Sequence, residues 1–191
     1  MGSHVGYESR LELAALMFED FDPTVHWISS QPFEMEAKVD GAPRRHVPDY
    51  LIQRDDHSIC VIDVKPRRML QRPQVAEALA WPAAMFAERG WHYRIVSEPK
   101  AIYFANVRFL AGYRRATQFA EFDLGAVLQE VRGSVTLGGA FRAATVVVGD
   151  ASMARAVVLH LVWSRRLTCE LDAAPLNVDT PLNVDTPVVA R

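Results

Sequence analysis

The segment that most constrains the fold is residues 59–65, a run of mostly β-branched, apolar residues ended by a proline. This composition predicts a β-strand, because β-branched side chains pack well on a pleated sheet and proline cannot continue its hydrogen-bonded ladder. Successive side chains of a strand point to opposite faces, so Asp63 and Lys65 share one face while Ile62 and Val64 share the other. An aspartate and a lysine on one face of an otherwise apolar strand require polar partners.

The preceding strand is expected to bring a second aspartate close to Asp63. Asp49 opens a strand predicted over residues 47–53, and the polar turn at 54–58 predicts a hairpin that pairs it with residues 59–65. Two clustered carboxylates repel each other, and a hard divalent cation with oxygen ligands is the usual remedy.

This set of residue types suits the hydrolysis of phosphodiesters. Magnesium or manganese held by the two aspartates polarises a phosphoryl oxygen and lowers the pKa of a bound water. Lys65 can orient that water or offset the negative charge that develops on the phosphate. The alternative from spacing alone is a same-face ion pair between Asp63 and Lys65 on an exposed strand, worth under ~1 kcal/mol.

The order of predicted elements divides the chain into three parts. Residues 7–116 alternate helices and strands, which predicts an α/β core with a mixed central sheet flanked by helices. Residues 117–174 predict a small, mostly helical, winged-helix-like domain, and residues 175–191 predict an extended tail that begins with two copies of a six-residue repeat. The predicted helices are 8–20, 73–90, 100–116, 123–132 and 152–163, and the predicted strands are 25–28, 33–39, 47–53, 59–65, 91–96 and 167–171.

Composition narrows the class of protein. The 191 residues are 50% apolar and 23% charged, which is ordinary for a globular protein and argues against disorder. No run approaches the ~18 apolar residues of a membrane span, and the start of the chain lacks the pattern of a signal peptide. Two cysteines make neither a disulfide framework nor a zinc site, so a reducing cytoplasm is expected. Whether residues 1–4 are native is not decided by the sequence.

Several blocks, in order along residues 7–115, carry a resemblance to a known family. They are Glu8-Ser9-Arg10-Leu11-Glu12, Phe21-Asp22-Pro23-Thr24-Val25, Gln31-Pro32-Phe33, Val47-Pro48-Asp49-Tyr50-Leu51-Ile52, Asp63-Val64-Lys65-Pro66 and Gly90-Trp91-His92-Tyr93-Arg94-Ile95-Val96. Pro48-Asp49 with Asp63-Val64-Lys65 resembles the PD-(D/E)xK nuclease motif, and the blocks together resemble the N-terminal catalytic domain of TnsA-type transposon endonucleases. The resemblance implies a restriction-endonuclease-like fold, a divalent metal and cleavage of one DNA strand at transposon ends, beside a separate DDE transposase.

The resemblance also implies roles for particular residues. Asp49 and Asp63 correspond to the metal-binding acids, Lys65 to the lysine, and the main-chain carbonyl of Val64 to a further metal ligand. Glu12 corresponds to the helix acid of a Ser-x-x-Glu pattern, with metal-binding or water-positioning duty. One departure is that the family's prototype has glutamine where Asp63 stands, so this chain is nearer the general nuclease pattern.

From the residues alone, other interpretations stay open. Glu12 lies on a polar helix face with Glu8 and Glu19, which is typical of a solvated surface. The predicted DNA-binding residues flank the site as two pairs, Arg44-Arg45 and Arg67-Arg68. Guanidinium groups recognise phosphate oxygens bidentately, but a solvated loop carries the same residues. The histidines share no metal-ligand spacing, and His46, two residues before Pro48, is the one to examine near the site.

The sequence therefore predicts a Mg²⁺-dependent DNA endonuclease, with Mn²⁺ as a possible substitute, that is the TnsA-like subunit of a heteromeric transposase. Expected partners are DNA at transposon ends, a DDE transposase subunit and an AAA ATPase regulator, with no membrane. Two alternatives are a stand-alone restriction or repair nuclease of the same fold and a non-catalytic DNA-binding assembly module. The DNA target, the strand cut, the number of metals and the oligomeric state do not follow from the sequence.

Overall fold

The apolar run at residues 59–64 forms β5 (Ile59–Val64), an inner strand of a mixed four-stranded sheet, in the computed structural model, which describes residues 5–183. The order is β1-β4-β5-β6, where β1 is Val25–Ser30, β4 is Tyr50–Arg54 and β6 is His92–Val96. β4 pairs antiparallel with both β1 and β5, which confirms the predicted hairpin, and β6 lies parallel to β5. β5 is buried on both faces, as expected for an inner strand.

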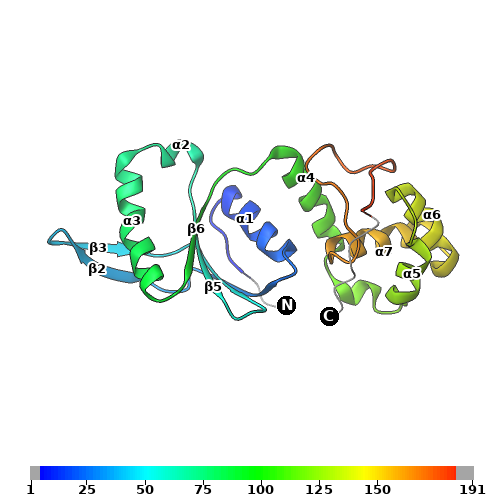
Figure 1. The fold of residues 1–191 in the computed structure, drawn as a ribbon, viewed down its shortest axis with the longest axis horizontal. Helices are drawn as coiled ribbons and strands as arrows, with labels where there is room; N and C mark the ends of the chain where they lie inside the picture. The colour runs from blue at the N-terminus through cyan, green and yellow to red at the C-terminus, as the bar shows by residue number, and fades with distance from the viewer. Residues whose placement is uncertain (1–4, 184–191) are drawn as a thin grey trace. The chain divides into compact units, whose positions relative to one another are not determined.

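A parallel neighbour requires a crossover connection, which two helices supply. α2 (Arg67–Leu70) follows β5 directly, and α3 (Pro73–Glu88) leads back to β6 (Figure 1). α3 confirms the helix predicted over residues 73–90, and Pro73 is tolerated because the first helical N–H needs no partner in the helix. The short α2 was not predicted.

The alternation along β5 divides the core of this unit into two clusters on opposite faces of the sheet. One face packs Cys60, Ile62 and Val64 against α1 (Arg10–Phe21) through residues that include Ala15. The other face packs Val61 against α3; its members are Phe33, Met35, Leu51, Val61, Trp81, Met85, Phe86, Trp91 and Tyr93. Because side chains alternate, Asp63 lies on the same face as Val61, the α3 face.

The segment before β4 corrects one prediction. Residues 35–46 form a separate hairpin, β2 (Met35–Val39) paired with β3 (Ala42–His46), around the predicted turn at Asp40-Gly41. Both turn residues have positive φ, 51° and 79°, which suits a tight hairpin. The strand predicted over 47–53 therefore begins only at Tyr50, because Pro48 has no N–H for a ladder and separates β3 from β4.

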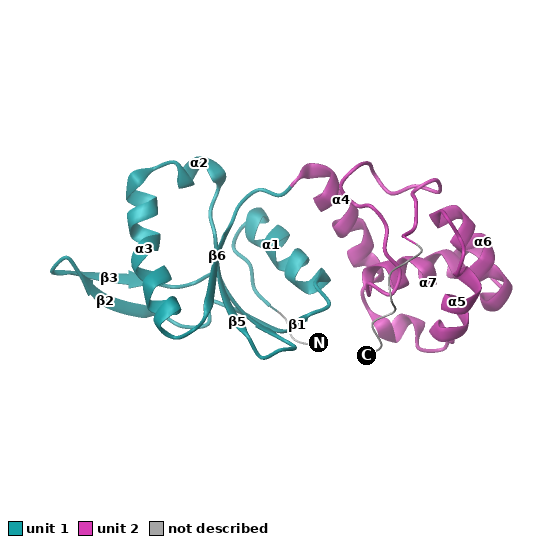
Figure 2. Ribbon diagram, viewed as in Figure 1, with its two compact units in different colours: residues 1–99 teal, residues 100–191 magenta. Residues whose placement is uncertain are grey.

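The chain divides into two compact units, residues 1–99 and 100–191 (Figure 2). We predicted a boundary at residue 116, whereas α4 (Ala101–Leu110) groups with the second unit. One contact that joins α4 to this unit is made by Asn106, whose buried side chain donates hydrogen bonds to the carbonyls of Leu171 and Ala174 at 2.9 and 2.8 Å. The other elements of this unit are η1 (Ala111–Tyr113), η2 (Ala116–Phe119), α5 (Leu124–Val131), α6 (Leu137–Val148) and α7 (Ala151–Trp163).

The winged-helix-like prediction for this unit is not confirmed. α5 and α7 match two predicted helices, but α6 was not predicted, and the strand expected at 167–171 is only an isolated bridge between Cys169 and Leu182 within the described residues. The tail packs on this unit as far as it is described: Gly138 donates its N–H to the carbonyl of Val178 at 2.8 Å. A Cβ at Gly138 would lie 2.9 Å from that carbonyl oxygen, so glycine is required there. The rest of the predicted tail, residues 184–191, lies outside the described residues.

Across residues 5–183, no single helix has the length and apolar character needed to cross a membrane. α6 and α7 meet that test only when taken together, as a pair bent by 117°.

Candidate active site

The β4–β5 hairpin places Asp49 beside the end of β5. Tyr50 pairs with Ile62, so the residues before and after this pair, Asp49 and Asp63, lie at the same end of the hairpin. Oδ2 of Asp49 accepts a hydrogen bond from the Val64 N–H at 2.6 Å. The same oxygen lies 3.4 Å from Nζ of Lys65. The structure therefore brings together Asp49, Asp63 and Lys65, as predicted.

Lys65 is held by the strand next to it. Its N–H donates to the carbonyl of Val96 at 2.9 Å, and the hydroxyl of Ser97 donates to its carbonyl at 2.7 Å. These two bonds extend the pairing of β5 with β6 past the last strand residue. The Lys65 side chain is about one-third exposed (33%), so its ammonium reaches solvent next to the two aspartates.

Asp63 is the most buried charged residue of the site, with a side chain that is 0% exposed. Its Oδ2 accepts a hydrogen bond from the hydroxyl of Tyr93 and lies 2.9 Å from Nε2 of His46. Its Oδ1 has no hydrogen-bond partner anywhere in residues 5–183. A buried carboxylate oxygen without a partner costs about 1–3 kcal/mol of folding free energy, so we expect a ligand to bind at this atom.

The carboxyl groups of the site influence one another. Burial raises the pKa of Asp49, and the negative charges of Asp63 and Glu12 raise it further, against the lowering effect of the Val64 N–H and the Lys65 ammonium. Burial and the bond to Asp63 likewise raise the pKa of Tyr93, so its hydroxyl stays protonated and donates. Negative charge is thus concentrated here beyond what one lysine offsets, which is the electrostatic setting that attracts a cation.

The side chain of Glu12 makes local hydrogen bonds at the start of α1. Ser9 caps α1, and its hydroxyl accepts from the Glu12 N–H at 3.1 Å, while Oε2 of Glu12 accepts from the Glu8 N–H at 2.7 Å. This arrangement resembles a capping box, which stabilises the start of a helix, except that Glu12 accepts from the residue before the cap. In the described part of the chain, no three His, Cys, Asp or Glu side chains form a metal-binding group, so the metal-binding role of Glu12 stays a prediction. Its charge still acts on Asp49.

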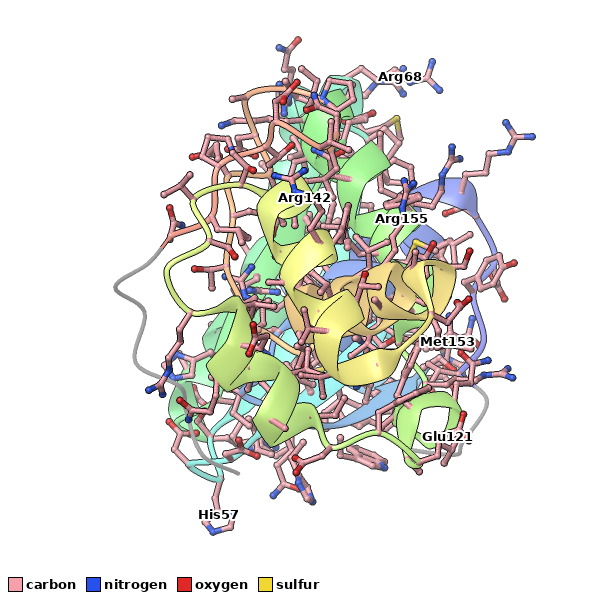
Figure 3. The ribbon with its side chains drawn as sticks, turned by 90° about the vertical axis from the view of Figure 1, so that its right-hand side faces the viewer. His57, Arg68, Glu121, Arg142, Met153 and Arg155 are labelled. Carbon is pink, nitrogen blue, oxygen red and sulfur yellow. The ribbon has the colours of Figure 1, made fainter. Side chains whose placement is uncertain are left out.

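The four arginines predicted to bind DNA differ in the ion pairs and hydrogen bonds that their side chains make within the protein. Arg44 and Arg45 lie on β3, where Nε of Arg45 pairs with Glu36 at 2.8 Å. Arg44 lies 3.8 Å from Glu77 of α3. Arg67 and Arg68 lie on α2, and the guanidinium of Arg67 donates to the carbonyl of Glu98 at 3.1 Å. Arg68 is exposed and extends away from the ribbon (Figure 3).

One residue of the site, Tyr93, was missed as a functional candidate, and His46 was singled out without a role. Tyr93 approaches Asp63 because it pairs with Val61 in the parallel β5–β6 register. No local sequence pattern indicates this register. His46 approaches Asp63 from the base of the β2–β3 hairpin. Its place two residues before Pro48 is the signal that singled it out in the sequence, although no role followed from it.

Two aspartates and a lysine at the end of an inner strand, in a mixed sheet with helices on both faces, define a nuclease-like α/β domain. Carboxylate oxygens are the ligand type that Mg²⁺ prefers, and the unpaired buried Oδ1 of Asp63 fits a cation.

Residues 22–98 match the family model described as TnsA-like endonuclease N terminal. The first unit therefore contains a TnsA-like endonuclease domain, as the resemblance indicated. The matched segment includes Asp49, Asp63 and Lys65, whereas Glu12 lies before it. No curated protein matches the chain.

Proposed function

We propose that the chain is a Mg²⁺-dependent DNA endonuclease that hydrolyses phosphodiester bonds. The observation that carries the proposal is the buried Asp63, which offers an unpaired oxygen beside Asp49 and Lys65 within a TnsA-like endonuclease domain. Most buried carboxylate oxygens in native proteins have a hydrogen-bond partner, so the unpaired Oδ1 of Asp63 supports a bound ligand over a purely structural ion pair.

The residues that would hold the metal are Asp49, Asp63 and the main-chain carbonyl of Val64, with Mn²⁺ able to substitute. A bound Mg²⁺ supplies a water of lowered pKa and polarises a phosphoryl oxygen. Water and phosphate oxygens would complete the coordination, since Mg²⁺ usually keeps several such ligands and takes few from the protein. Glu12 would contribute through its charge on Asp49 and not as a direct ligand.

Lys65 acts on the attacking water and on the phosphate. Its ammonium is tied to Asp49 at 3.4 Å and fixed through its backbone to β6, so it stays within reach of a phosphate bound at the two aspartates. There it orients the attacking water and offsets the negative charge that develops on phosphorus. Hydrolysis adds the water oxygen to phosphorus, breaks the P–O3′ bond, and leaves a 5′-phosphate and a 3′-hydroxyl.

The substrate proposed is DNA at transposon ends, with the chain acting as the TnsA-like subunit beside a DDE transposase and an AAA ATPase regulator. Family membership of residues 22–98 supports this assignment. Arg68, exposed and next to the end of β5, is the arginine best able to contact a DNA phosphate. Such contacts position the duplex without reading its sequence.

The test combines metal binding with DNA cleavage on the full chain. Mn²⁺ binding is measured by electron paramagnetic resonance with a short duplex present, and nicking is measured on supercoiled plasmid with Mg²⁺. We expect both to be lost in Asp63→Asn and nicking alone to be lost in Lys65→Ala. Asp40→Asn is the matched control, because asparagine suits the same turn position. If the wild-type chain binds no Mn²⁺ even with DNA, the proposal fails and an assembly module is the better description.

A further inference from the structure

Asp63 is held by two side chains to which no motif assigns a role. The Tyr93 hydroxyl donates a hydrogen bond to Oδ2, and Nε2 of His46 lies 2.9 Å from the same oxygen. Both contacts fall on one oxygen of the carboxylate, and Oδ1 is buried without a partner in the described part of the chain. The protein therefore distinguishes the two oxygens of a group that would otherwise present them equally.

Both side chains are fixed in place by aromatic packing. The Tyr93 ring lies 5.3 Å from the ring of Phe86, which is 1% exposed. The His46 ring meets Trp81 of α3 edge-on, with ring centroids 6.1 Å apart, and its side chain is only 13% exposed. Neither residue can turn away from Asp63 without breaking this packing, so the carboxylate has little freedom to rotate.

His46 acts on Asp63 mainly by attraction. Its Nε2 is within ion-pair distance of Oδ2, but the atoms are not aligned for a hydrogen bond, and Nε2 is buried without another partner among the residues described. The contact is favourable when Nε2 carries the proton, because the N–H dipole then points its positive end at the carboxylate.

We propose that Tyr93 and His46 are positioning residues that hold Oδ2 of Asp63 and so present Oδ1 to the divalent cation. The inference rests on the proposed function, since it assumes a metal at Asp49 and Asp63. A carboxylate already oriented in the metal-free protein loses less rotational freedom when the cation binds. Partners of metal ligands commonly account for 10–100-fold in metal affinity.

The experiment is a Mn²⁺ titration of the full chain by electron paramagnetic resonance. Tyr93→Phe removes only the hydroxyl, and we expect it to raise the Kd for Mn²⁺ about tenfold or more. His46→Ala is expected to do the same, whereas His46→Gln should recover most of the affinity because its amide N–H can occupy the place of Nε2. Tyr7→Phe and His92→Gln make the same chemical changes at exposed positions and serve as controls.

A purely structural role would give a different pattern. We expect saturating Mn²⁺ to return the maximal nicking rate of Tyr93→Phe to the wild-type value, because only affinity is lost. Thermal unfolding and near-ultraviolet circular dichroism report whether each variant folds. If Tyr93→Phe does not fold, the difference between His46→Ala and His46→Gln decides the inference.

Two outcomes separate this inference from the proposed function. If Asp63→Asn abolishes Mn²⁺ binding while folded Tyr93→Phe and His46→Ala bind within twofold of wild type, the positioning role is refuted and the metal site stands. If Asp63→Asn binds Mn²⁺ as the wild type does, the metal site itself is wrong and the positioning role falls with it.

Discussion

Asp49→Asn is predicted to change the stability of the first unit in opposite directions without and with Mg²⁺. In the metal-free protein, burial and the charges of Asp63 and Glu12 raise the pKa of Asp49 despite the favourable Val64 N–H and Lys65. The ionised carboxylate therefore opposes folding at neutral pH. Asparagine keeps the shape and an oxygen acceptor for the Val64 N–H but carries no charge, so the metal-free variant should unfold at a higher temperature than the wild type.

With Mg²⁺ present, we expect the wild type to unfold at a higher temperature than Asp49→Asn. A ligand that binds only the folded state stabilises it by about 1.4 kcal/mol at tenfold its Kd. Because the first unit spans residues 1–99, this free energy raises its Tm by roughly 6–11 °C. Asp49→Asn should show little or none of this rise.

The pH dependence follows from the same raised pKa. A carboxyl whose pKa is higher in the folded state contributes stability below its unfolded pKa, and this contribution is lost as pH rises through the folded value. The advantage of metal-free Asp49→Asn is therefore expected at pH 7 and should shrink as pH falls through the raised pKa of Asp49, where the wild-type carboxyl is also neutral.

Differential scanning calorimetry in EDTA and in Mg²⁺ measures both effects, with Asp40→Asn as control. The reasoning is refuted if metal-free Asp49→Asn unfolds below the wild type, because the carboxylate would then be favourable without a cation. It is refuted equally if Mg²⁺ raises the Tm of both proteins by the same amount.

Three further predictions concern other parts of the chain. Glu12→Gln should leave the stability of α1 nearly unchanged, because glutamine can accept the same hydrogen bond at the helix start. It should weaken Mn²⁺ binding about two- to threefold, because the negative charge that acts on Asp49 is lost. A tenfold or larger loss would make Glu12 a direct ligand. Asn106→Ala should destabilise the second unit by about 2–4 kcal/mol, because the Asn106 side chain makes three hydrogen bonds to the backbone of residues 171–176. Urea unfolding measures this loss, and an unchanged urea midpoint would contradict it. Arg68→Ala should reduce the slope of log K for DNA against log salt by about 0.9, whereas Arg89→Ala, which removes an exposed arginine bonded to its own helix, should not.

The part of the site that could be predicted from the sequence is the part set by local rules. Strand alternation placed Asp63 and Lys65 on one face, and a short polar turn between two strands predicted the hairpin that brings Asp49 alongside. Both conclusions needed only the two-residue period of a strand and the chemistry of a turn. The role of Glu12 stays a prediction, because its Ser-x-x-Glu pattern also forms local hydrogen bonds at the start of α1.

The boundaries of helices and strands were harder to predict where a proline or a glycine interrupts the pattern. The strand expected over 47–53 includes a proline that ends one ladder and precedes another, so β4 was predicted to start too early, and β3 was not predicted. The helix α6 was missed because its first turn contains Gly138 and Gly139, which are poor helix formers. Gly138 is there because the tail approaches its backbone closely, and that reason is visible only once the tail is in place.

The inner strand, the hairpin and the acid and lysine types could be predicted from the sequence, because each follows from neighbours a few residues apart. That Tyr93 and His46 hold Asp63, and that α4 groups with the second unit, became visible only in the folded chain. Those contacts depend on a parallel register across a crossover and on packing between segments that are distant in sequence. The free energy of such pairings is spread over many residues, and no single local pattern encodes it.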